Sequence, residues 1–124
     1  MLADSRAFSG YSVDDLDKAE AFYRDTLGLP VERADEMPIL RVSFAGDRHS
    51  ILYAKPDHQP ATFTVLNFPV PDVDAVVDGL AARGVVFEHY EGFGQDEKGV
   101  MRDRGPQIAW FKDPAGNILS VVEE

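Results

Sequence analysis

The chain has 124 residues, of which 44% are apolar, and its 22 acidic and 12 basic residues give a formal net charge of −10. That length and apolar content fit one globular domain, whereas the acidic balance disfavours nucleic acid as a partner. With no cysteine, disulfides, thiol nucleophiles and iron–sulfur centres are excluded, and no stretch reaches the roughly 18 apolar residues of a membrane-spanning helix.

The first residues lack the basic and then apolar pattern of a secretory signal. We therefore expect a cytoplasmic protein with no membrane partner.

The first half of the chain predicts a strand, a helix and three further strands. Residues 6–13 are β-compatible, and residues 15–27 repeat apolar side chains at three- and four-residue steps, as an amphipathic helix does. Gly28 follows the last apolar position and suits a left-handed helix cap. Three strand candidates come next, at residues 30–33, 39–44 and 50–55.

The second half repeats that order after a polar, proline-rich linker at residues 56–60. It predicts a helix at residues 73–83 and four strands, at residues 63–70, 85–90, 107–112 and 118–123. The pattern Val13-x-Asp15-Leu16-Asp17 recurs as Val70-x-Asp72-Val73-Asp74, at a constant offset of 57 residues (70 − 13). This recurrence indicates an internal duplication rather than a chance order of elements.

Two segments carry a family resemblance. They are Val13-x-Asp15-Leu16-x-x-Ala19-x-x-Phe22-Tyr23-x-x-x-Leu27-Gly28-Leu29 and Phe111-x-Asp113-Pro114-x-Gly116-Asn117. Together with the repeat they resemble the opening and closing signatures of the vicinal-oxygen-chelate superfamily, which includes glyoxalases, bleomycin-resistance proteins and extradiol dioxygenases. The resemblance implies an α+β domain over residues 1–124, built from two tandem β-α-β-β-β modules at about residues 5–56 and 61–124. The modules would form a cupped cleft of mixed sheets with the helices outside.

The resemblance also implies where metal ligands would stand. Metal-using members carry a His on the first strand and a Glu on the last strand of each half, and these positions fall here on Phe8, Tyr53, Val65 and Ser120. None of the four is a usual ligand of a divalent metal. We therefore expect neither a metal nor another cofactor.

An unorthodox metal site is the alternative. The three histidines are His49, His58 and His89, and His89-x-Glu91 would supply only two donors on one strand face. The acidic residues of the long loop at 91–106 are better explained as solvated charges. This loop is glycine-bearing and is predicted to act as a mobile lid.

Strand alternation predicts which side chains line the cleft. Phe8, Gly10 and Ser12 share one face, opposite Tyr11 and Val13, and on the fifth predicted strand Val65, Asn67 and Pro69 share a face. The predicted ligand-binding residues are Phe8, Arg41, Tyr53, Val65, Asn67, Trp110 and Ser120. Such a set suits a partly aromatic small molecule, and Arg41 suits a carboxylate or phosphate on it. A one-residue shift of its strand would instead point Arg41 to solvent.

Three functions remain open on these grounds. The favoured one is a metal-free protein that binds a small molecule, as bleomycin-resistance-like members do. The second is an enzyme of the same fold, a lyase, isomerase or dioxygenase with an unorthodox site. The third is a structural or regulatory dimer with a vestigial cleft. Relatives of this size also imply a homodimer, in which exposed sheet edges are covered.

Overall fold

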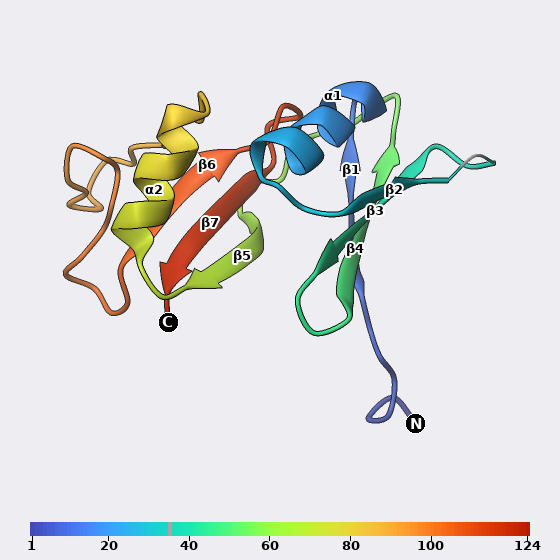
Figure 1. Cartoon of the computed structure of the whole chain (residues 1–124), viewed down its shortest axis with the longest axis horizontal. Coiled ribbons are helices and arrows are strands. Elements are labelled where there is room, and N and C mark those ends of the chain that lie inside the picture. The colour runs from blue at the N-terminus through green and yellow to red at the C-terminus, as the bar shows by residue number, and fades with distance from the viewer. Residues whose placement is uncertain (35) are drawn as a thin grey trace. The chain divides into compact units, whose positions relative to one another are not determined.

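The computed structural model describes residues 1–34 and 36–124 and divides the chain into two compact units. Unit 1 comprises Met1–Gln59 and unit 2 comprises Pro60–Glu124. Each unit holds one mixed sheet and one helical segment (Figure 1). The predicted pair of β-α-β-β-β-like modules is therefore confirmed.

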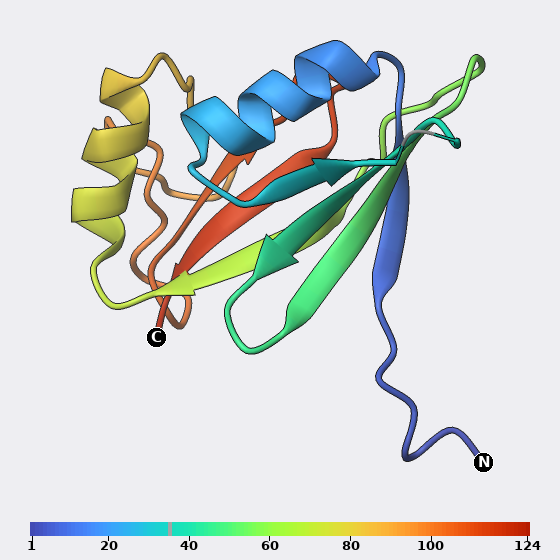
Figure 2. The same ribbon diagram turned by 45° about the vertical axis from the view of Figure 1, so that its right-hand side comes forward.

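Unit 1 contains a four-stranded sheet in the order β1-β4-β3-β2. Its strands are β1 (Ser9–Val13), β2 (Val31–Arg33), β3 (Ile39–Phe44) and β4 (Arg48–Ala54). β1 runs parallel to β4, whereas β3 is antiparallel to both β2 and β4. The helix α1 (Leu16–Ala21) continues into a π-helical turn, η1 (Phe22–Thr26), and the two lie along one face of the sheet (Figure 2).

Unit 2 contains a three-stranded sheet in the order β5-β7-β6. Its strands are β5 (Thr64–Val70), β6 (Ile108–Lys112) and β7 (Ile118–Glu123). β5 is parallel to β7 and β6 is antiparallel to it. The helix α2 (Val73–Ala82) packs on this sheet through the buried side chains of Val73 and Val77.

The two duplicated aspartates have the same structural role in each unit. Asp15 Oδ1 accepts a hydrogen bond of 3.1 Å from the Lys18 backbone N–H, and Asp72 Oδ1 accepts one of 3.0 Å from the Ala75 backbone N–H. Both residues have extended backbones and cap the first turn of the helix that follows. The repeat seen in the sequence is thus a repeat of the strand-to-helix junction.

Burial confirms the predicted faces of β1. Tyr11 and Val13 are buried, whereas Phe8 and Gly10 on the opposite face are exposed. The neighbouring strands agree with this assignment, because Leu40 and Leu52 pair in register and are both fully buried. We call the face of the unit 1 sheet opposite these buried residues its open face.

One predicted strand is wrong. Residues 85–90 form only a single bridge, between Phe87 and Phe111, instead of a strand. The physical reason lies in the side chain of Gln95. Its Oε1 accepts a hydrogen bond of 2.6 Å from the Tyr90 N–H, and its Nε2 donates one of 2.8 Å to the Glu88 carbonyl. These backbone groups are therefore satisfied locally and do not extend a ladder.

Two further differences concern local geometry. The predicted helix at residues 15–27 changes to π geometry at Phe22, where the Leu27 N–H donates to the Phe22 carbonyl at 3.0 Å. On β5 the register shifts between Thr64 and Leu66, so Val65 is the extra residue of a bulge. The alternation predicted for β5 consequently fails at its first residues.

The closing signature forms a tight turn before β7. The buried Asp113 carboxylate accepts hydrogen bonds from the backbone N–H groups of Ala115 and Asn117 and from the Asn117 side chain. Gly116 has a φ of 86°, and a Cβ there would lie 3.1 Å from Pro60 Cβ. A left-handed backbone and a close neighbour together explain why this position holds glycine.

No helix in the described part of the chain is long and apolar enough to cross a membrane.

Candidate functional site

Three of the predicted site residues lie on unit 1. Arg41 is exposed on the open face, where it pairs in register with Ile51, so the alternative register that would move it to the other face is not observed. Tyr53 lies on the same face, at 39% exposure. Phe8 precedes β1, is 60% exposed, and stacks on the His49 ring with centroids 4.7 Å apart.

The other predicted residues lie on unit 2, and three of them form one row across its sheet. Asn67, Ser120 and Trp110 stand opposite one another on β5, β7 and β6. The fully buried Ser120 hydroxyl donates a hydrogen bond of 2.5 Å to Asn67 Oδ1. Directly paired residues project to the same face of a sheet, so this row presents the Asn67 amide and the Trp110 indole on one face, on either side of Ser120.

Beside this row lies an open pocket of about 420 Å³. Trp110, Tyr90 and Phe93 form its aromatic wall, with ring centroids 5.3–5.7 Å apart in tilted and edge-on pairs. Its remaining lining residues are Thr62, Phe63, Thr64 and Ile118. We call this space the aromatic pocket. Its volume and its apolar walls fall within the range of small-molecule sites.

Tyr90, one of the residues that line the aromatic pocket, has a hydroxyl group that no described residue satisfies. The Tyr90 hydroxyl is buried and has no hydrogen-bond partner among the described residues. Burial raises the pKa of this phenol, and the negative charge of Glu88 raises it further, so the hydroxyl stays protonated and able to donate at neutral pH. A buried donor without a partner costs free energy that a bound acceptor would recover.

The long loop brings Phe93 to the aromatic pocket and is tied to α2 by ion pairs. The Arg102 guanidinium lies 2.8 Å from Asp74 on α2 and 2.7 Å from Asp96 in the loop, and Lys98 lies 3.1 Å from Asp78. The Arg102 hydrogen bond holds the pKa of Asp74 below its usual range. The structure therefore shows how the loop is held, and its movement as a lid stays a prediction.

The residues at the four family metal positions do not fit a metal. Phe8 is engaged in stacking, Ser120 donates to Asn67, and Val65 is a bulge residue without a donor atom. Only the Tyr53 phenol remains, and one phenol is not a divalent-cation site. Within residues 1–34 and 36–124, no three His, Asp or Glu side chains come together as a cluster that would hold a metal ion.

Of the seven predicted ligand-binding residues, Trp110 lines the aromatic pocket, and its role in binding stays a prediction. Because of the bulge, Thr64 occupies the lining position on β5 that was expected for Val65. Tyr90 and Phe93 were not expected there. The available signal was the pair of aromatic residues that flanks Glu91 and Gly92, and assigning Tyr90 to a strand hid it.

The comparison with family profiles gives one match. The profile described as Glyoxalase/Bleomycin resistance protein/Dioxygenase superfamily matches residues 7–121. No curated protein sequence matches the chain.

Solved structures with the same fold include both binding proteins and enzymes. TnmS3, an antibiotic-binding protein from Streptomyces sp. CB03234, is 25% identical with a TM-score of 0.70, and the match covers 97% of each chain. A glyoxalase/bleomycin resistance protein from the same organism is 26% identical with a TM-score of 0.63, covering 94% of this chain and 99% of that one. Lactoylglutathione lyase from Agrobacterium tumefaciens is 25% identical with a TM-score of 0.68, covering 98% and 95%.

Proposed function

We propose that this chain, which belongs to the glyoxalase/bleomycin resistance protein/dioxygenase superfamily, binds a small, partly aromatic molecule without the help of a metal. The observation that carries the proposal is the aromatic pocket, whose lining includes Tyr90 with its buried and unsatisfied hydroxyl. A flat ring would stack against Trp110 or Phe93, and a shift of the side chains that cover the Tyr90 hydroxyl would let an acceptor on that ring take its hydrogen bond.

Asn67 and Ser120 lie in the same row as Trp110 but do not line the aromatic pocket, so in this proposal they offer a polar contact to the part of a ligand that extends beyond the pocket. Ser120 occupies one lone pair of Asn67 Oδ1, and this fixes the orientation of the exposed amide. The amide nitrogen of Asn67 is then free to face the ligand as a donor. Ser120 acts in this scheme by positioning Asn67, because its own hydroxyl is fully buried.

Two facts support binding over catalysis. The four positions that bear metal ligands in metal-using members offer one phenol and one hydroxyl that is already engaged. Among the structural neighbours, TnmS3 is described as an antibiotic-binding protein, which is a role that needs a pocket and no reacting group. Sequestration is accordingly the activity that we propose for this chain.

Trp110 makes the proposal directly measurable. It is the only tryptophan of the chain and it lines the aromatic pocket, so intrinsic tryptophan fluorescence reports from the site itself. We expect a saturable change in emission on titration with polycyclic aromatic compounds that carry a carbonyl or phenol oxygen. Phe93→Ala should weaken binding about tenfold, since a stacking ring contributes roughly 1 kcal/mol or more.

Val86→Ala is the matched control for this experiment. Val86 is exposed on unit 2 and does not line the pocket, so its truncation should leave the titration unchanged. If no compound of the panel alters Trp110 emission, or if both variants alter the titration equally, the aromatic pocket is not a ligand site. That outcome would favour the structural or regulatory role with a vestigial cleft.

A metal-dependent enzyme is the competing function, and the likeness to lactoylglutathione lyase is the observation that favours it. The test is elemental analysis of protein purified without chelator. Stoichiometric zinc, nickel, manganese or iron that Tyr53→Phe removes would overturn the proposal of a metal-free protein.

We also propose that the chain forms a homodimer, because β2 is an edge strand of the unit 1 sheet and exposed sheet edges favour pairing with another chain. Light scattering of the purified chain measures this directly. A mass of one chain, about 13.7 kDa, at all concentrations would contradict the proposal.

A further inference from the structure

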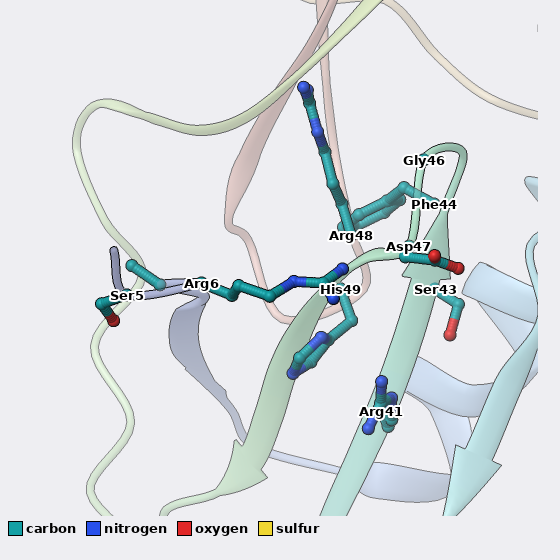
Figure 3. A pocket seen from close by; sticks show the side chains of 10 residues that line it. Ser5, Arg6, Arg41, Ser43, Phe44, Gly46, Asp47, Arg48 and His49 are labelled. Atoms are coloured by element: carbon teal, nitrogen blue, oxygen red, sulfur yellow. The ribbon is translucent and has the colours of Figure 1, made fainter. Parts of the chain in front are cut away.

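Unit 1 contains a second and larger pocket at the end of its open face. Its volume is about 790 Å³, and its walls come from the segment before β1, from β3, and from the hairpin that leads into β4 (Figure 3). Three of its lining side chains are arginines, namely Arg6, Arg41 and Arg48. We call this space the arginine pocket.

The arginines reach the pocket from three different elements. In Figure 3, Arg6 extends from the N-terminal segment toward the strands, Arg41 lies on β3, and the side chain of Arg48 extends away from Arg41. The hairpin that positions Arg48 is tight, because Gly46 and Asp47 both have positive φ angles, of 77° and 56°. Only the folded structure brings these three arginines to one pocket, and their spacing in the sequence does not reveal it.

The three arginines of the arginine pocket lack the ion-pair partners that other basic residues of this chain have among the described residues. With partners among residues 1–34 and 36–124, six of the twelve basic side chains form ion pairs: Arg24, Arg33, Lys55, Lys98, Arg102 and Lys112. Within the residues that the structure describes, no ion pair or side-chain hydrogen bond involves Arg6, Arg41 or Arg48. Acidic residues are abundant in the chain, yet among the residues described by the structure Asp47 alone contributes a carboxylate to the lining of the pocket.

Three arginines around one cavity make the local electrostatic potential positive, and this favours the binding of an anion there. A guanidinium presents paired N–H donors that match a carboxylate or phosphate in two-point contacts. The Phe8 and His49 stack, with His49 itself lining the pocket, adds a flat wall beside this charge. The net charge of −10 repels a large polyanion at longer range, so a small ligand suits the site better than a nucleic acid.

We infer that the arginine pocket binds a small multivalent anion, one that carries a phosphate group or several carboxylates. This inference is independent of the proposed function, because the arginine pocket and the aromatic pocket have no lining residue in common.

Isothermal titration of the full chain with pyrophosphate, and separately with citrate, tests the inference. We expect saturable one-to-one binding of at least one of them, and the one that binds identifies phosphate or carboxylate chemistry. Arg41→Gln and Arg48→Gln should each lower the affinity about tenfold. Arg41→Lys should lower it less, because lysine keeps the positive charge and loses only the paired N–H donors of the guanidinium.

Lys18→Gln is the charge-matched control. It removes one positive charge from an exposed position on α1 that does not line the pocket, so it should change the affinity less than about twofold. As a second measurement, the backbone amide signals of Gly46 and Asp47 should shift on titration of the ¹⁵N-labelled wild-type chain, and that of Gly79 on α2 should not.

Three results would overturn the inference. The first is that neither anion binds at low ionic strength. The second is that Lys18→Gln weakens binding as much as Arg41→Gln, which would mean a response to overall charge alone. The third is that the amide shifts fall outside the hairpin. If the anion titration fails, the result of the Trp110 titration with aromatic compounds is unaffected. If the Trp110 titration fails, the result of the anion titration is unaffected.

Discussion

The Ser120 hydroxyl donates a hydrogen bond of 2.5 Å to Asn67 Oδ1, across the parallel pair β7 and β5. Ser120 occupies a position where metal-using relatives place a carboxylate ligand, and here it binds a neighbouring strand instead of a metal. Because the serine is fully buried, this bond contributes to the stability of the sheet and fixes the Asn67 amide at the same time.

A double-mutant cycle measures that bond. Ser120→Ala and Asn67→Ala should each destabilise the chain by about 1 kcal/mol, and the double variant should lose less than the sum by about 1 kcal/mol. Urea denaturation followed by Trp110 fluorescence provides the free energies. Strict additivity would show that the two side chains are not coupled.

Removal of the Tyr90 hydroxyl should have opposite effects on the stability of the chain and on its affinity for a ligand. Tyr90→Phe removes a buried donor that has no partner, so the free energy of unfolding should stay unchanged or rise by about 1 kcal/mol at most. Affinity for an aromatic ligand with an acceptor oxygen should fall about tenfold. A loss of stability equal to the loss of binding energy would mean that the hydroxyl has a structural role.

The raised pKa of Tyr90 should also make the stability of the chain depend on pH in the alkaline range. Burial raises the pKa of Tyr90 above the value of about 10 expected in the unfolded chain, so the folded chain holds the proton longer. The resulting stabilisation is complete below pH 10 and is lost as the pH rises through the folded-state pKa. Wild type should therefore lose stability above pH 10 more steeply than Tyr90→Phe does. Parallel pH profiles of the two proteins would contradict this.

Arg102 should control the position of the long loop. Arg102→Gln removes the contacts to Asp74 and Asp96, so Phe93 should loosen from Trp110 and the tryptophan emission should shift to the red. In wild type the ion pair holds the pKa of Asp74 low, so the loop stays fixed above about pH 3.9 and is released only as the pH falls further, through the folded-state pKa. A red shift centred above pH 5, or an equal shift in Lys18→Gln, would rule out this role.

The closing turn depends on one carboxylate. Asp113→Ala should cost about 2–4 kcal/mol, because Asp113 is buried and accepts three hydrogen bonds from Ala115 and Asn117. Asp113→Asn keeps one acceptor oxygen and should cost about half as much. Asp103→Ala, at an exposed position, is the control and should change stability by less than about 0.5 kcal/mol. Equal losses of stability in Asp113→Ala and Asp103→Ala would show that the Asp113 carboxylate does not stabilise the closing turn.

Much of the fold can be predicted from the sequence because the relevant interactions are local. The caps at Asp15 and Asp72 bond to backbone groups three residues away, and the apolar spacing of α2 and the alternation of β1 each involve a few neighbours. From these features, both helices and seven of the eight predicted strands are found where the sequence predicts them. The same features also predict the two faces of the unit 1 sheet. The four residues at the metal positions can also be read directly, and they already argue against a metal.

Tertiary structure alone decided the details of the pockets. The bulge at Val65 arises from how β5 pairs with β7, and the missing strand at residues 85–90 follows from hydrogen bonds made by Gln95. Likewise, Tyr90 and Phe93 contact Trp110, and Arg6 and Arg41 line one pocket, only after the chain has folded. Local patterns determine which elements form, whereas long-range pairing and loop paths determine which side chains share a cavity, and no short-range sequence signal encodes that.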